Sequence, residues 1–411
     1  MPILPYTTDA ENRRKKIVRV RHGAIHSCTQ GGFSVTMSIA AVNTTEKNRR
    51  EFFMSAKDGM NYAPEGKKLE PVCKKGDFRV GVIGLDHGHI TGMCSGLVEA
   101  GAEITMVYDP DAAKAEGFAA RFPGTKIAAR REDVLEDKSI QMIASAAVTA
   151  DRCAVGLDAL SHGKHYFSDK APFTTLDQLA SARAKVAETG LIWAVCYSER
   201  VQNEAAVHAG RLIMDGVIGR VLQVIGMGPH RLNAPSRPEW FFQKERYGGI
   251  LTDIGSHQIE QFLYYSGATD ARVLHAKVAN YAHPEYPELE DFGDATLVAD
   301  NGATNYFRVD WFTPDGLGTW GDGRTFILGT EGYIEMRKYI DVARSPEGNH
   351  VFLVTGDREE MISVTGKVGF PYHGELILDC LNGTQNAMPQ EHTFKAAELC
   401  ISAQNTATRI V

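Results

Sequence analysis

Residues 78–84 read FRVGVIG, a short apolar run that ends in a glycine turn. Such a run is typical of a buried strand in a parallel sheet, because both faces of that strand are covered. A helical stretch follows to Ala100, and a second apolar run over residues 103–108 ends at Asp109. Together these segments predict one strand-helix-strand unit.

The same alternation continues to about residue 195. Predicted strands cover residues 126–128, 140–144, 165–167 and 191–195, and predicted helices cover residues 112–122, 132–136, 152–160 and 176–189. Strands that alternate with helices favour an α/β fold with a doubly wound parallel sheet. Farther on, longer β-branched and aromatic runs with hairpin signals such as 300–302 (DNG) predict an α+β domain with a large, mostly antiparallel sheet. We therefore expect a Rossmann domain over residues 77–199 and an α+β domain over residues 200–411.

The first 76 residues show neither helical nor strand periodicity, and we expect a weakly ordered extension there. A further hypothesis is that translation starts at Met54. Arg49 and Arg50 can be encoded as AGG-AGG, which resembles a bacterial ribosome-binding sequence just before that methionine. The alternative, a genuine extension that begins at Met1, stays open.

Composition and charge exclude several kinds of partner. The 411 residues carry a formal net charge of -7, so the chain lacks the basic excess that binds nucleic acid or anionic membranes. No apolar run approaches the roughly 20 residues of a membrane helix, and no signal peptide is apparent. The 7 cysteines form no C-x-x-C pair, which is typical of a reducing compartment. We expect a cytoplasmic protein whose partners are small molecules or other subunits.

The turn after the first predicted strand is a candidate dinucleotide site. Residues 84–89 read GLDHGH, where the fingerprint would read G-x-G-x-x-G, so Asp86 and His89 replace its second and third glycines. The context strengthens this weak motif, because Asp109 ends the next strand about 20 residues on, where an acid binds the adenosine ribose. That acid would repel a 2′-phosphate. We therefore predict NAD in preference to NADP.

Other roles for these residues stay open. Asp86 would then only cap the following helix, and Asp109 would only open a turn. His87 and His89 are either solvated loop residues or donors of ring N–H groups to phosphate. We do not expect a metal site, since the sequence identifies no third ligand beside the two histidines.

Two further segments carry candidate catalytic residues. Lys170 follows a predicted strand and so lies at the carboxyl edge of the sheet, where ligands of doubly wound folds bind. Asp253 and His257 are four residues apart, on one face if the segment is helical. Such a histidine can take a hydroxyl proton near neutral pH, with the carboxylate close by. Taken singly, these residues are equally typical of a surface charge and of a local helix pair.

In order and spacing, these segments resemble the glucose-fructose oxidoreductase, inositol dehydrogenase and rhizopine-catabolism protein family, called Gfo/Idh/MocA. The resemblance covers about residues 78–411. It rests on the glycine turn at 84–88, on residues 163–170, on the strand exit at 199–200, on DGVIGRV at 215–221 and on GGILTDIGSH at 248–257. Asp169 stands where the family has glutamate, and Ala171 stands where it has proline.

The resemblance implies an open-faced C-terminal sheet that forms homodimers or homotetramers, and hydride transfer between nicotinamide and a sugar or cyclitol carbon. It implies that Lys170 hydrogen-bonds the reacting hydroxyl, that Asp253 binds or orients the substrate and that His257 takes the proton. The predicted cofactor-binding residues are Gly84, Asp86, His87, Gly88, His89, Asp109 and Lys170.

The segment over residues 228–247 combines aromatic and polar side chains that suit a sugar, although its aromatic run is equally typical of a core or a subunit contact. Arg324, at the end of a second candidate loop, is predicted to meet an anionic group. The predicted substrate-binding residues are Lys170, Arg200, His230, Trp240, Tyr247, Asp253 and His257.

We expect an NAD-dependent dehydrogenase that oxidises a secondary hydroxyl of a sugar, glycoside or cyclitol to a ketone. One alternative is a redox-neutral glycosidase or lyase that oxidises C3 transiently, eliminates the aglycone and returns the hydride to NAD. Another is a non-catalytic ligand sensor. The retention of Lys170, Asp253 and His257 argues against the sensor.

Overall fold

The computed structural model describes residues 59–411, so the hypothetical start at Met54 and most of the predicted extension lie outside the described residues. Residues 59–76 contain one short 3-10 helix, η1 (Gly59–Asn61), and otherwise irregular backbone. This segment packs on the body of the protein. The Lys67 N–H donates to a Glu204 carboxylate oxygen at 3.0 Å, and the Tyr62 ring lies edge-on to the Trp320 ring, with 5.5 Å between their centroids.

Six parallel strands form the first sheet, in the order β3-β2-β1-β4-β5-β6. The strands are β1 (Arg79–Ile83), β2 (Glu103–Tyr108), β3 (Lys126–Ile127), β4 (Met142–Ser145), β5 (His165–Asp169) and β6 (Trp193–Cys196). The predicted first strand is β1, and the strand order reverses between β1 and β4. This is the doubly wound arrangement that the sequence predicts.

Helices cover both faces of this sheet. They are α2 (His89–Glu99), α3 (Ala112–Arg121), α4 (Arg131–Leu135), α5 (Arg152–Ser161) and α6 (Leu176–Thr189). Successive residues of β1 enter different cores, because side chains alternate across a strand. Val82 belongs to the core that contains Met93 of α2, whereas Ile83 belongs to the core that contains Val155 of α5.

Nine strands form the second sheet, in the order β14-β13-β12-β11-β7-β10-β9-β8-β15. They are β7 (Val221–Pro229), β8 (Ala271–Ala279), β9 (Phe292–Ala299), β10 (Thr304–Asp310), β11 (Arg324–Gly329), β12 (Gly332–Arg337), β13 (His350–Thr355), β14 (Glu359–Ser363) and β15 (Thr408–Arg409). The sheet is mostly antiparallel, with parallel pairs only at β7/β10 and β8/β15 among these strands. The predicted hairpin turn joins β9 to β10, and Gly302 in it has φ +85°.

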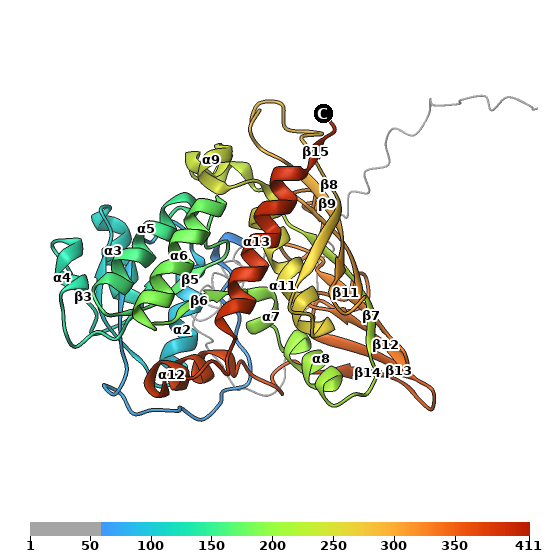
Figure 1. The fold of residues 1–411 in the computed structure, drawn as a ribbon, viewed down its shortest axis with the longest axis horizontal. Coiled ribbons are helices and arrows are strands. Elements are labelled where there is room, and N and C mark those ends of the chain that lie inside the picture. The colour runs from blue at the N-terminus through green and yellow to red at the C-terminus, as the bar shows by residue number, and fades with distance from the viewer. Residues whose placement is uncertain (1–58) are drawn as a thin grey trace, which may run out of the picture. The chain divides into compact units, whose positions relative to one another are not determined.

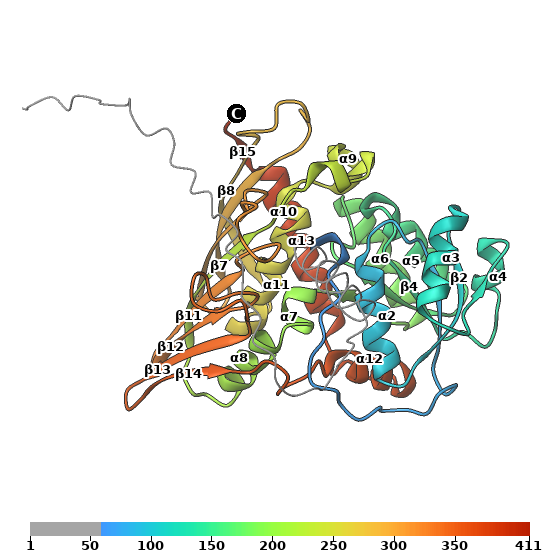
Figure 2. The same ribbon diagram turned by 180° about the vertical axis from the view of Figure 1, so that it is seen from behind.

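The remaining helices lie against or between the sheets. They are η2 (Thr149–Asp151), α7 (Ser198–Val201), α8 (Glu204–Met214), η3 (Ala234–Ser236), η4 (Glu239–Phe242), α9 (Lys244–Tyr247), α10 (Ile250–Asp253), α11 (Gly255–Ser266), α12 (Tyr372–Asn382) and α13 (Gln390–Thr406). Helices α8, α11 and α13 cover the inner face of the second sheet, and α13 runs between the two sheets (Figures 1 and 2). None of the described helices covers its outer face (Figure 2).

Candidate active site

The glycine turn lies at the point where the strand order reverses. Gly84 follows β1 with φ +85°, a conformation that glycine adopts without strain. A Cβ atom there would lie 2.7 Å from the Cβ of Ala147, in the loop after β4. Ligands of doubly wound folds bind in the crevice between such neighbouring strand ends. The turn therefore lies where a dinucleotide is expected.

Asp109 ties the end of β2 to this turn. Its Oδ2 accepts a hydrogen bond from the Leu85 N–H at 2.7 Å, and its Oδ1 accepts one from the Asp111 N–H at 2.9 Å. Asp109 therefore shapes the turn before Pro110 and also orders the glycine turn. A carboxylate oxygen can accept more than one hydrogen bond, so this arrangement also fits the hydroxyls of a ribose.

Asp86, at the second glycine position, does not cap α2. Its Oδ1 accepts from Lys114 Nζ at 2.7 Å, and its Oδ2 accepts from the Val148 N–H at 3.2 Å. Helix α2 instead begins after Gly88, without a side-chain cap. The capping alternative is therefore wrong, because the carboxylate links the turn to α3 and to the loop after β4.

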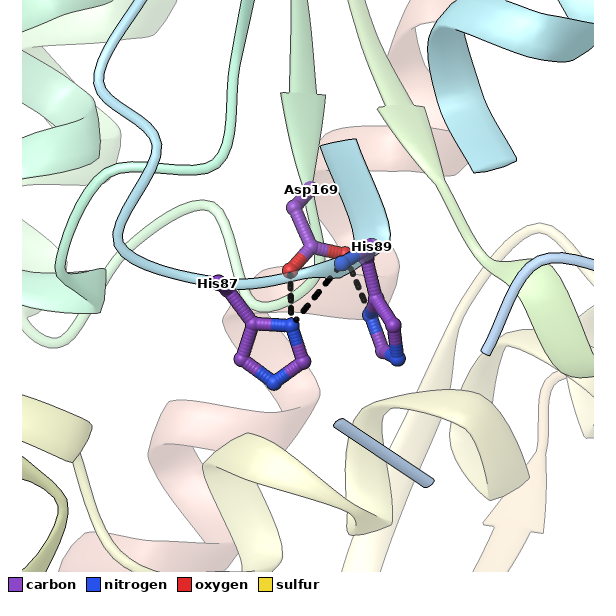
Figure 3. A group of neighbouring side chains, drawn as sticks. All are labelled: His87, His89 and Asp169. Atoms are coloured by element: carbon purple, nitrogen blue, oxygen red, sulfur yellow. Dashed lines mark hydrogen bonds and ion pairs between the residues drawn. The ribbon is translucent and has the colours of Figure 1, made fainter. Parts of the chain in front are cut away.

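His87 and His89 both point at Asp169, the last residue of β5 (Figure 3). The distance from His89 Nδ1 to Asp169 Oδ1 is 3.0 Å, and that from His87 Nδ1 to Oδ2 is 3.7 Å. Both rings are buried, so the interpretation as solvated loop residues is wrong. The expectation that no third ligand accompanies them is also corrected, because the fold brings Asp169 to them from 80 residues away.

Several atoms of this cluster have other partners that compete with a metal ion. Arg152 Nη2 lies 3.0 Å from Asp169 Oδ2, and the Lys170 N–H donates to Oδ1 at 2.9 Å. The His89 N–H donates to His87 Nδ1 at 3.3 Å. Burial and His89 hold the pKa of His87 well below its usual value. Because the Arg152 guanidinium already balances the carboxylate charge, we interpret the cluster as a network that holds the end of β5.

Lys170 and Asp253 come from different parts of the fold and meet in a buried ion pair. Lys170 follows β5, Asp253 ends α10, and Lys170 Nζ lies 2.5 Å from Asp253 Oδ1. Burial opposes ionisation of the Asp253 carboxyl, but Lys170 outweighs burial and lowers its pKa. The Lys170–Ala171 peptide bond is cis, although residue 171 is not proline.

His257 lies in the first turn of α11, beside this pair. Asp253 ends α10 and His257 lies in α11, and Ile254 between the two helices also has helical φ and ψ. Burial lowers the pKa of His257 to about 3, against the raising effect of Glu199 and with help from Lys170. At neutral pH the imidazole is therefore uncharged, which is the form that accepts a proton.

His230, at the end of β7, belongs to the same group. Its Nδ1 lies 3.1 Å from the Gly228 carbonyl oxygen, and its Nε2 lies 4.0 Å from Glu199 Oε1. Burial lowers its pKa to about 4, and the charges of Glu199, Lys170 and Asp253 all act on it. The fold therefore brings His230 together with Lys170, Asp253 and His257.

Arg200, a predicted substrate residue, and Arg324 both pair with carboxylates of the protein. Arg200 Nη2 lies 2.6 Å from Glu260 Oε1, and its guanidinium stacks 4.0 Å from the centroid of the Tyr264 ring. Arg324 Nη2 lies 2.7 Å from Asp322 Oδ2. Both cations are therefore already balanced by neighbouring carboxylates.

The aromatic residues of the predicted sugar loop also make internal contacts. The Tyr247 hydroxyl donates to the Glu288 carbonyl at 3.2 Å and accepts from the Glu290 N–H at 3.0 Å. The Trp240 ring packs edge-on against Phe241, with 6.0 Å between centroids. These contacts order the loop. Burial raises the pKa of the Tyr247 hydroxyl and Asp253 adds to this effect, so Tyr247 lies near the group around Lys170.

A buried ion pair next to this group has no signature in the sequence. Glu199 Oε2 accepts from Lys338 Nζ at 2.9 Å and from Gln258 Nε2 at 3.1 Å, and all three side chains are buried. Glu199 stood out only as part of a strand exit. Lys338, just after β12, carries no local signal that separates it from a surface lysine.

Comparison with known proteins identifies the family. A model of the oxidoreductase family with an NAD-binding Rossmann fold matches residues 78–197, and a model of the GFO/IDH/MocA C-terminal domain matches residues 207–335. A solved structure from Erwinia carotovora atroseptica SCRI1043 is 50% identical and covers 82% of this chain and 100% of that chain, with a TM-score of 0.79. The chain belongs to the Gfo/Idh/MocA family.

Two curated members of the Gfo/Idh/MocA family illustrate its activities. Bacillus subtilis (strain 168) scyllo-inositol 2-dehydrogenase (NAD(+)) is 29% identical over 240 residues, which are 57% of this chain and 66% of that protein. Paenarthrobacter nicotinovorans D-xylose dehydrogenase is 26% identical over 190 residues, which are 45% of this chain and 47% of that protein. The chain thus spans less than two thirds of the length of these curated relatives.

Membership of the Gfo/Idh/MocA family confirms the predicted fold and the prediction of an NAD-binding oxidoreductase. The cofactor fits the site, because the Gly84 turn allows close approach and Asp109 presents its carboxylate at the end of β2. Within residues 59–411, every helix is too short or too polar to cross a bilayer. The roles of individual side chains remain predictions.

Proposed function

We propose that this protein is an NAD-dependent dehydrogenase that oxidises a secondary hydroxyl of a sugar, glycoside or cyclitol to a ketone. The observation that carries the proposal is the buried contact of Lys170 with Asp253 at 2.5 Å, with a neutral His257 in the next helix. The activities named for the inositol and xylose dehydrogenase relatives support this substrate class.

The three side chains divide the chemistry of an alcohol oxidation. The Lys170 ammonium donates a hydrogen bond to the reacting oxygen and stabilises the negative charge that develops there. Asp253 holds Lys170 and orients the substrate, and the His257 imidazole accepts the hydroxyl proton. When bound at the glycine turn, NAD supplies the acceptor for the hydride that leaves the substrate carbon. The products are a ketone, a proton on His257 and reduced cofactor.

The preference for NAD over NADP is part of the proposal. Asp109 is the acid at the end of β2, and both of its oxygens point at backbone N–H groups of neighbouring turns. A 2′-phosphate beside this carboxylate would meet a like charge in a buried place, which is unfavourable. We expect NAD to be used in preference to NADP at equal concentration.

The direct test is a panel of cyclitols, aldoses and glycosides, assayed for NADH or NADPH absorbance with the two cofactors side by side. At least one sugar or cyclitol is expected to give steady NADH formation. Release of an aglycone without net NADH would instead support the redox-neutral glycosidase. A complete lack of turnover and of ligand binding would contradict both.

We also propose that the outer face of the second sheet joins two or four copies of the chain in the cytoplasm. Leu274, Tyr306, Phe326 and Leu328 on β8, β10 and β11 are 49%, 40%, 36% and 38% exposed. Apolar side chains gathered on one face favour association. The six cysteines within residues 59–411 are unpaired, which suits a reducing compartment. Sedimentation equilibrium tests the assembly, and a monomer at micromolar concentration would contradict it.

A further inference from the structure

Glu199 has one oxygen with two donors and one oxygen with none. Its Oε2 accepts from Lys338 and Gln258, whereas its Oε1 is buried without a hydrogen-bond partner among residues 59–411. A carboxylate oxygen that leaves water without gaining a donor is costly. Burial opposes ionisation of Glu199, but Lys338, His257 and His230 together lower its pKa to about 2. The free oxygen is therefore a charged acceptor.

His230 presents a second acceptor to the same spot. Because its Nδ1 faces the Gly228 carbonyl at 3.1 Å, Nδ1 must carry the hydrogen in the neutral ring. Its Nε2 is then an acceptor, and it lies 4.0 Å from Glu199 Oε1. Neither atom supplies a hydrogen to the other. The pair is matched by a ligand group that donates hydrogen bonds.

Aromatic rings fix this pair and complete its surroundings. The His230 ring lies 4.5 Å from the Trp320 ring and 5.4 Å from the Trp311 ring, centroid to centroid. Gln258, the neighbour of His257 in α11, donates to Glu199 Oε2 at 3.1 Å, so the pair lies beside the helix that carries the proposed proton acceptor.

We infer that Glu199 and His230 bind a second hydroxyl group of the substrate, so that the site selects compounds with at least one hydroxyl besides the one that is oxidised. This inference rests on the proposed function and names the residues that recognise its substrates away from the reacting carbon. A hydroxyl donates to Glu199 Oε1 or to His230 Nε2. A keto, ether or methylene group at that position cannot.

The test is a thermodynamic cycle in which one protein side chain is changed and one substrate hydroxyl is removed, singly and together. Calorimetry measures binding of myo-inositol, D-glucose, D-xylose and their monodeoxy analogues to the full chain with NADH. For wild type, loss of one particular hydroxyl is expected to weaken binding about 10- to 100-fold, as for a hydrogen bond to a charged group. In Glu199→Gln, the same deletion is expected to change binding by less than about twofold, because the charged acceptor is gone.

Two further variants separate binding from folding. Glu199→Gln/Lys338→Met also removes the cation that the single variant leaves unpaired, and it is expected to show the same loss of coupling. The matched control is Glu260→Gln, because Glu260 is also buried, paired with a cation and left with one unpartnered oxygen among the described residues. In that control the penalty for the deleted hydroxyl should remain.

The possible outcomes distinguish a failure of this inference from a failure of the proposed dehydrogenase function. Equal penalties in wild type and in both Glu199 variants, at every hydroxyl, would overturn the inference while NADH formation in the panel still supports the dehydrogenase. Neither binding nor turnover of any probe would overturn both. A penalty that disappears at one position only, and only in the Glu199 variants, supports the inference.

Discussion

Lys170 and Asp253 owe their proposed role to being buried as a pair. At 2.5 Å each balances the charge of the other, and removal of one partner would leave an uncompensated charge inside the protein. His257 differs from both, since burial keeps it neutral and it has no hydrogen-bond partner for Nδ1 among residues 59–411. It can therefore be changed without unpairing a charge.

The first prediction concerns His257→Asn. Loss of the proton acceptor is expected to lower kcat by about 10²- to 10⁴-fold, while affinity for NADH changes little. Steady-state rates and fluorescence titration with NADH measure the two effects. The control is His392→Asn, a histidine of α13 that pairs with Glu260 at 3.1 Å. Unchanged turnover in His257→Asn would favour another proton acceptor.

The second prediction concerns Gly84→Ala. The new methyl group would meet Ala147 and would force a left-handed conformation, so we expect weaker NADH binding and a loss of about 1–3 kcal/mol in the free energy of unfolding. Gly117→Ala in α3 is the control, because no other described atom lies within 4 Å of its new Cβ. That change should stabilise the helix by up to about 1 kcal/mol. Equal stability of the two variants would contradict the prediction.

Among single residues of the site, those with a local sequence signature could be predicted, and those whose position depends on tertiary packing could not. Lys170, Asp253 and His257 follow strands and glycine turns that local patterns reveal. Lys338 reaches Glu199 from 139 residues away, and no pattern connects them. Arg200 lies at the strand exit that the sequence pattern marks, but in the fold its guanidinium forms an ion pair with Glu260.

Among the elements, the strands of the first sheet were predictable because burial on both faces makes them continuous apolar runs. The division between α10 and α11 was not, since Ile254 between them keeps a helical conformation and carries no local stop signal. The order of the nine strands also depends on contacts between distant segments. Only neighbouring hairpins such as β9/β10 carry a local signal.

The segment over residues 59–76 is an element whose contacts exceed what its sequence pattern suggested. Its Gly59 carbonyl oxygen lies 3.1 Å from His89 Nε2, and the Tyr62 ring packs on both Trp320 and Tyr339. The segment therefore joins the glycine turn to residues beside β11 and β12 of the second sheet. It is held by a few contacts rather than by a helix or strand.

The third prediction is that Tyr62→Ala loosens this segment. Loss of the two ring contacts should make trypsin cleave faster after Lys67 and Lys68, because cleavage requires local opening of the backbone. Mass spectrometry of timed digests measures the rate at these sites. Tyr281→Ala removes a ring that is 53% exposed and serves as the control. Equal cleavage rates in the two variants would argue against a structural role for Tyr62.

For the molecule as a whole, buried neutral histidines predict sensitivity to acid. Burial lowers the pKa of His257 to about 3, and those of His230 and His373 to about 4. The unfolded chain would protonate these groups near pH 6.5, so it binds more protons than the folded chain between that pH and about 4. Stability is therefore present above the unfolded value and is lost as the pH falls through this window.

The fourth prediction follows from the lowered pKa values of these buried histidines. The free energy of unfolding should decrease by up to about 1.4 kcal/mol per pH unit for each of the three histidines as the pH falls from about 6.5 to about 4. Urea titrations at several pH values measure the slope. His275→Gln, at an exposed position on β8, should leave the slope unchanged. A flat profile over this range would contradict the burial of neutral imidazoles.

The proposed function depends on the transfer of a hydride from a secondary carbinol carbon to NAD. The most direct measurement supplies the best substrate of the panel with deuterium on that carbon and follows cofactor and product by mass spectrometry. Direct hydride transfer is expected to give one singly deuterated NADH for each ketone formed, with NAD as acceptor. Product without net reduced cofactor, or reduced cofactor without deuterium, would contradict it.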